Sequence, residues 1–107
     1  MENSLNSINR LRCPTHPGAV LREDVLPAIR MSVSAFARAL RVSRQTVHGL
    51  LSEKHGITPE MAVRLGAYLG NGPRLWLDMQ SQHDLWFAEQ KLVNVLPTLG
   101  HAPAAFC

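Results

Sequence analysis

The sequence predicts an all-α domain of five helices, and three observations support this prediction. Ala, Leu and Met total 30 of the 107 residues, whereas Val, Ile and Thr total only 15. Small and straight-chain residues lose less side-chain freedom in a helix than β-branched residues do. Apolar residues recur at helical spacing, and no stretch alternates apolar and polar residues as a half-buried strand does. The length allows one domain with one modest core.

Composition and the first residues limit the class of protein. Hydrophobic residues make up 46% of the chain and charged residues 18%, which is typical of a globular protein rather than a disordered one. No apolar run approaches the roughly 20 residues that span a bilayer, and Met1 to Ser4 show no secretion signal. Two cysteines, Cys13 and Cys107, are too few for a disulfide framework. We therefore expect a cytoplasmic protein without a membrane partner.

The first helix follows a segment without helical periodicity. Residues 1–14 are expected to form a flexible arm. Pro17 fits the first turn of a helix, where its missing N–H costs nothing. Leu21 and Val25 then fall on one face, and Pro27 is expected to end the helix.

The second and third helices are separated by only three residues, 41–43. Ser32 or Ser34 can N-cap the second helix, and Ser43 can cap the third. The apolar positions of both helices repeat at helical spacing. They are Val33, Phe36, Ala37 and Leu40 in the second helix and Val47, Leu50 and Leu51 in the third. Two helices joined so closely form the helix-turn-helix pattern.

Proline and glycine mark the last two helices. Thr58 and Pro59 begin the fourth helix and Gly70 ends it. Gly72 and Pro73 begin the fifth, whose larger side chains follow one stripe: Leu75, Trp76, Met79, His83 and Trp86. We expect the domain to cover residues 15–96 and residues 97–107 to form a flexible tail.

The net charge of +3 is concentrated in one part of the chain. Residues 30–55 contain five basic side chains and one acidic one, which gives +4; residues 1–29 sum to zero and residues 56–107 to −1. Such a patch is the electrostatic footprint of a polyanion-binding surface. A solvated basic face without a partner is the alternative reading.

The outer face of the third helix can read DNA. With its apolar residues turned inward, Arg44, Gln45 and His48 point outward. Arg pairs with guanine and Gln with adenine in the major groove. The surrounding polar residues are candidates for phosphate contacts. They are Ser34, Arg38, Arg41, Ser43, Thr46, Ser52 and Lys54. An ordinary helical hairpin with a polar face is the alternative.

These residues resemble a known family. The stretch 34–47 is similar to the helix-turn-helix of the Xre/Cro superfamily, which has a lambda-repressor-like fold. His16-Pro17-Gly18, followed by residues 21–24, resembles the opening motif of HigA-type antitoxins, also called the VapI group. Residues 56–62, 75–80 and 84–86 resemble later segments of that family. The chain departs at Ala19, where the family usually has Glu, and at Arg41, where the turn usually has Gly.

The resemblance implies a DNA-binding antitoxin that represses its own operon. Its partners would be double-stranded operator DNA and a HigB-type toxin, a ribosome-dependent mRNA endonuclease. When bound to DNA the protein would be associated with the nucleoid. A stand-alone repressor without a toxin is the nearest alternative, and an interaction module that no longer binds DNA is another. No nucleophile–base pair, carboxylate pair or phosphate-binding loop suggests an enzyme.

Family members are typically homodimers, and the fifth helix is our candidate for the dimer interface. Large aromatic and Met side chains are enriched in interface cores, and Trp76, Met79, His83 and Trp86 are the candidates. These side chains could instead complete the core of one chain. Cys13 and His16 have half of a zinc-like spacing without a second pair, so the sequence predicts neither a metal nor a cofactor.

Overall fold

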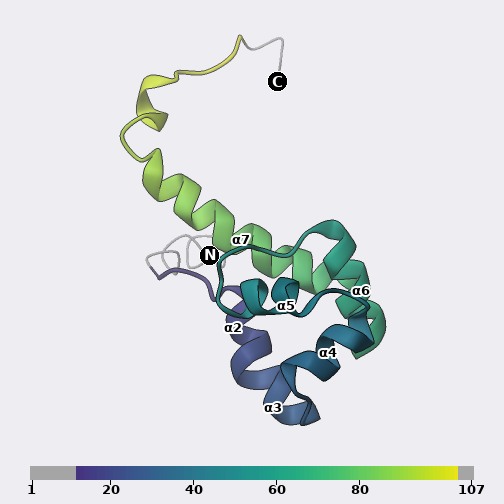
Figure 1. Ribbon diagram of the computed structural model, residues 1–107. Coiled ribbons are helices and arrows are strands. Elements are labelled where there is room, and N and C mark those ends of the chain that lie inside the picture. The colour runs from purple at the N-terminus through teal and green to yellow at the C-terminus, as the bar shows by residue number, and fades with distance from the viewer. Residues whose placement is uncertain (1–11, 104–107) are drawn as a thin grey trace.

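The computed structural model describes residues 12–103, and all regular structure among them is helical (Figure 1). The predicted arm therefore lies outside the described residues except for residues 12–14, as do the last four residues of the predicted tail. The elements are α2 (Pro17–Val20), η1 (Leu21–Val25), α3 (Leu26–Ile29), α4 (Val33–Leu40), α5 (Arg44–Leu51), α6 (Pro59–Leu69), α7 (Pro73–Lys91) and η2 (Leu96–Thr98). No helix in this range is long and apolar enough to cross a membrane.

The prediction that Pro27 ends the first helix is wrong. The segments α2, η1 and α3 follow one another without a break, and η1 is a π-helical turn. In this turn the Leu26 amide donates to the Leu21 carbonyl, five residues back. The wider turn accommodates a ring that would otherwise collide with the carbonyl four residues earlier. The helix ends instead at Arg30, which is left-handed with a φ of 54°.

The two helices at residues 33–51 form the predicted helix-turn-helix. Ser32, rather than Ser34, caps α4, and its hydroxyl accepts from the Ala35 amide at 3.1 Å. Ser43 caps α5 in the same way, accepting from Thr46 at 3.0 Å. Between them, Arg41 adopts a left-handed conformation with a φ of 60° and a ψ of 45°. A non-glycine residue pays about 1 kcal/mol for this conformation.

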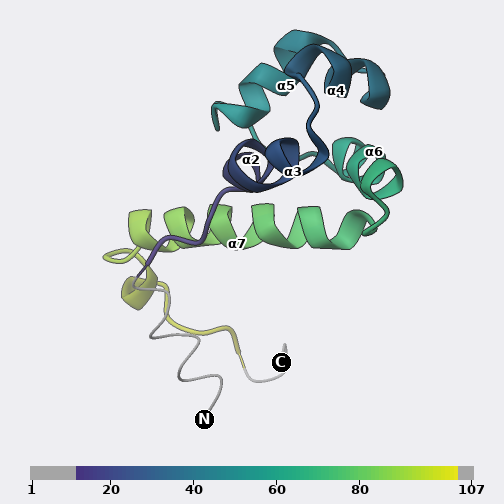
Figure 2. The same cartoon turned by 90° about the horizontal axis from the view of Figure 1, so that it is seen from below.

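The core lies between the helix-turn-helix and α7. Its largest fully buried side chains come from α2, η1, α4, α5, α6 and α7; they include Leu21, Phe36, Val47, Leu50, Leu65 and Trp76. Figure 2 shows α4 and α5 on one side of the molecule and α7 across the other, with α2, α3 and α6 between them. The face of α4 and α5 that points away from α7 is therefore open to a partner.

The last two helices begin as predicted. Thr58 caps α6, and Gly70 ends it with a φ of 81°. Helix α7 stops at Lys91, and Pro97 lies in the first turn of the short 3-10 helix η2 rather than in unstructured chain. The C-terminal end of α7 and η2 extend beyond the packed body (Figure 1).

Candidate nucleic-acid interface

The outer face of α5 carries the three side chains predicted to read bases. Arg44, Gln45 and His48 are exposed, whereas Val47 and Leu50 on the opposite face are each only 1% exposed. No described residue forms a hydrogen bond or an ion pair with the side chain of Gln45 or His48. These groups are available for base edges, and the helix is anchored by its other face.

The N-terminal ends of α4 and α5 lie together. Nη1 of Arg44 donates to the Ser34 hydroxyl at 3.2 Å, which joins the first turn of α5 to the first turn of α4. The first intrahelical bond of α5 runs from the Val47 amide to the Ser43 carbonyl. The amides of Arg44 and Gln45 therefore precede that bond and face outward at the positive end of the helix dipole, where a phosphate oxygen can bind.

The charge around these helices is positive. Arg38, Arg41 and Lys54 are exposed, and none of them forms an ion pair with another described residue. The one acidic side chain of the basic window, Glu53, is paired with Arg22 at 3.3 Å. The cations on this side of the molecule are thus uncompensated, as a phosphate-binding surface requires.

Besides Ser34, whose hydroxyl accepts from Arg44, three of the predicted phosphate contacts are hydroxyl groups already bound within the chain. Ser43 caps α5, and its Oγ also lies 2.8 Å from the hydroxyl of Thr46. Ser52 donates to the Gly49 carbonyl at 3.2 Å. Each hydroxyl can still accept a further bond, but its first role is to shape the ends of α5.

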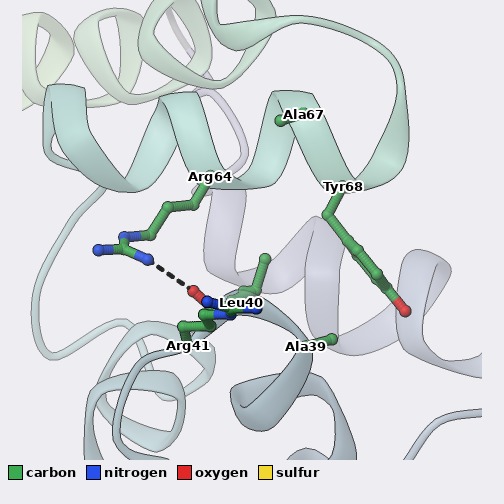
Figure 3. A pocket seen from close by; sticks show the side chains of 6 residues that line it. All are labelled: Ala39, Leu40, Arg41, Arg64, Ala67 and Tyr68. Carbon is green, nitrogen blue, oxygen red and sulfur yellow. Dashed lines mark hydrogen bonds between the residues drawn. The ribbon is translucent and has the colours of Figure 1, made fainter.

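Two arginines that sequence reasoning did not single out hold the C-terminal ends of α4 and α5. Nη1 of Arg64 donates to the Leu40 carbonyl at 2.8 Å (Figure 3), and Nη1 of Arg22 donates to the Leu51 carbonyl at 2.6 Å. Arg22 lies in the 21–24 motif, but the sequence analysis assigned no role to this residue. Arg64 had no distinguishing signal, because a lone Arg on a helix is most often a solvated side chain.

Figure 3 also shows the shallow depression beside Arg64, of about 320 Å³, between α4 and α6. It is lined by Ala39, Leu40, Arg41, Arg64, Ala67 and Tyr68. Such an open hollow lacks the enclosed apolar walls of a small-molecule site. Between residues 12 and 103, no group of three or more His, Cys, Asp or Glu side chains is arranged to hold a metal ion.

The His16-Pro17-Gly18 motif is a structural junction rather than a binding site. The His16 ring is 5% exposed and caps α2, with Nδ1 accepting from the Gly18 amide at 2.8 Å. The ring packs edge-on against His83, with centroids 4.8 Å apart. Burial, and secondarily the neighbouring His83, lower the pKa of His16 below its ordinary value. His16 therefore shapes the start of the first helix.

The candidates for a dimer interface on α7 occupy different environments. Trp76 is 1% exposed and donates to Asn71 at 3.0 Å, so it belongs to the core of one chain and is removed from the interface candidates. Met79, His83 and Trp86 are partly buried. Large apolar residues are exposed from the second half of α7 onward. They are Leu85, Phe87, Leu92, Val93, Val95, Leu96 and Leu99.

The sequence and the fold of this chain are similar to those of known proteins. No protein-family model matches the chain. It is 43% identical over 83 residues to "Virulence-associated protein I" of Dichelobacter nodosus, covering 76% of this chain and 77% of that protein. It is 36% identical over 75 residues to antitoxin HigA-1 of Vibrio cholerae, covering 70% of each. Among solved structures it resembles the Pseudomonas aeruginosa antitoxin HigA with the higBA promoter, with a TM-score of 0.77 and 35% identity over 82% of this chain and 96% of that one.

Proposed function

We propose, because this chain belongs to the HigA-type family of helix-turn-helix antitoxins, that it binds operator DNA, represses its own operon and neutralises a HigB-type toxin. Helix α5 would enter the major groove. Arg44, Gln45 and His48 would contact base edges. Arg38, Arg41 and Lys54 would contact the flanking phosphates and set the register.

One observation carries this proposal. The exposed N-terminal half of α5 combines base-reading side chains with free helix amides, in the part of the chain that holds the excess positive charge. An ordinary helical hairpin with a polar face is not expected to combine base-reading side chains, free helix amides and excess positive charge. In addition, the hydrogen bond between Ser34 and Arg44 holds the first turns of α4 and α5 together.

The test is a fluorescence-anisotropy titration of the purified protein against a duplex from immediately upstream of its own reading frame. A scrambled duplex of the same composition is titrated beside it, at two salt concentrations. Arg44→Ala and Gln45→Ala should each weaken binding to the upstream duplex by about 1–3 kcal/mol and relax the base preference at one position. Their effect on the scrambled duplex should be small.

Arg74→Ala is the matched control, since Arg74 is an exposed cation in the first turn of α7, a helix on the opposite side of the molecule from α4 and α5 (Figure 2). Arg74→Ala should change the affinity for either duplex only by the small effect of removing one distant positive charge. Equal losses on both duplexes with Arg44→Ala would make that residue a phosphate contact. If the wild-type protein does not distinguish the two duplexes, the DNA-reading function is wrong and the interaction-module reading replaces it.

We propose further that the protein acts as a homodimer in the cytoplasm, with recognition helices about 34 Å apart in successive major grooves. The toxin would be the product of a neighbouring reading frame. Expression of that product alone should arrest growth, and co-expression of this chain should restore it. Growth arrest that this chain does not relieve would leave the stand-alone repressor as the function.

A further inference from the structure

The C-terminal end of α5 is held by one side chain from the first helix. Nη1 of Arg22 donates to the Leu51 carbonyl at 2.6 Å and lies 3.3 Å from Oε2 of Glu53. Nη2 of the same guanidinium donates to Glu23 at 2.8 Å. Arg22 therefore contacts both the last residue of α5 and the residue two positions beyond it.

The first helix approaches α5 closely enough to make this contact. Gly18, one turn before Arg22, lies against the backbone of Leu50: a Cβ at this position would come within 1.9 Å of the Leu50 carbonyl oxygen. Gly18 and Arg22 are four residues apart and share one helical face. This face meets the final turn of α5 at two consecutive carbonyls, those of Leu50 and Leu51.

The end of α5 needs such support. Glu53 has a φ of 64°, a left-handed conformation that costs a non-glycine residue free energy. The Ser52, Glu53 and Lys54 amides turn back onto the carbonyls of His48, Leu50 and Gly49. A cation beside the last carbonyls of a helix also interacts favourably with the negative end of its dipole.

We propose that Arg22 is a positioning residue for DNA reading. Its guanidinium fixes the C-terminal end of α5 through the Leu51 carbonyl, and it neutralises Glu53, the one acidic side chain of the basic window. Arg22 itself touches no DNA. The effect of Arg22 on DNA reading rests on the proposed function, but its effect on the end of α5 can be measured without DNA.

Four variants separate the parts of this proposal. Arg22→Met removes the charge and the donors, and Arg22→Lys keeps the charge but loses the planar fork. The double variant Arg22→Met with Glu53→Gln has the same net charge as the wild type, so it removes the hydrogen bonds from Arg22 to Leu51 and Glu23 without a change in net charge. Arg74→Met is the charge-matched control on α7.

The first measurement is amide hydrogen exchange of the free protein. In the double variant, the amides of Ser52, Glu53 and Lys54 should exchange about five- to tenfold faster, because a hydrogen bond from a charged donor to the end of the helix is lost. The amides of Ala62 and Gly70 in and after α6 should be unchanged, as should every amide in Arg74→Met. Unchanged exchange at residues 52–54 would overturn the proposal, whatever the protein binds.

The second measurement repeats the anisotropy titrations. The double variant should lose about tenfold in affinity for the upstream duplex and keep its affinity for the scrambled duplex and its salt dependence. Arg22→Lys should recover part of the loss. If Arg22→Met and the double variant both reduce the salt slope by about one unit, Arg22 contacts a phosphate and the positioning role is wrong. A wild-type protein that binds neither duplex would instead refute the proposed function.

Discussion

Replacing Gly18 by Ala should strongly destabilise the fold, because the new methyl group has no space. An ideal Cβ at this position lies 1.9 Å from the Leu50 carbonyl oxygen and 3.0 Å from Nδ1 of His16. Carbon and carbonyl oxygen make contact at about 3.3 Å, so α2 and α5 would have to separate by about 1.4 Å. Overpacking of this kind costs about 2–3 kcal/mol. For a domain of this size we expect Tm to fall by about 10–20 °C.

Gly49→Ala provides the control because its overlap is similar but its outcome should be opposite. A Cβ at Gly49 comes within 2.0 Å of the imidazole of His55, which is an exposed side chain and can rotate away. Ala then gains about 0.5–1 kcal/mol over Gly in the helix interior. Thermal unfolding followed by circular dichroism at 222 nm compares the two variants. Equal Tm values would refute the reasoning that the Leu50 backbone sets the close approach.

Three further predictions follow from the described contacts. Arg41→Gly should relieve about 1 kcal/mol of left-handed strain but increase the entropy of the unfolded chain by a similar amount, so Tm should hardly move. The salt slope of DNA binding should fall by about one unit if Arg41 contacts a phosphate, and an unchanged slope would exclude that contact. Because the pKa of His16 is lowered by burial, the unfolded chain binds a proton more readily than the folded one. Stability should therefore be constant above about pH 6.5 and fall as the pH drops below it. His16→Asn keeps an acceptor at the cap and should flatten this pH dependence; persistence of the full slope in Tm against pH would assign it to another group. Finally, Leu85→Asp should convert a dimer to a monomer in sedimentation equilibrium without lowering the helix content, since Leu85 is 51% exposed in one chain. An unchanged mass would place the interface elsewhere.

Sequence reasoning predicted most of the fold because its signals were local. Serine and threonine caps, prolines in first turns and a glycine after the last turn each act within a few residues. The starts of α4, α5, α6 and α7 were found in this way. The periodicity of the third helix likewise predicted that Val47, Leu50 and Leu51 are buried, and this is confirmed.

The features that were missed depend on contacts between distant parts of the chain. Arg22 meets Leu51 across 29 residues, and Arg64 meets Leu40 across 24. Neither arginine differs from a solvated surface cation in its own neighbourhood. Trp76 was ambiguous for a similar reason, because an apolar stripe does not indicate whether it faces the core or a partner. Packing of α6 against α7 decides this, and the stripe gives no information about that packing.

The π-helical turn contradicts the expectation that Pro27 ends the first helix, but the properties of proline on which that expectation rested also explain why the turn is wide. The expected pair on the buried face was Leu21 and Val25, at a spacing of four. In an α-helix, residues five apart point roughly 140° away from each other. The wide turn instead bonds the Leu26 amide to the Leu21 carbonyl, which brings both leucines to the buried side, where they are 8% and 0% exposed. Pro27 lacks an N–H and disfavours the α-helical register at this point, so the wider turn suits both the proline and the spacing of the leucines. An apolar pair five residues apart, followed at once by proline, was therefore the signal for a helix that continues. The same turn contains Arg22, so the departure from regular helix lies in the segment that holds the end of α5.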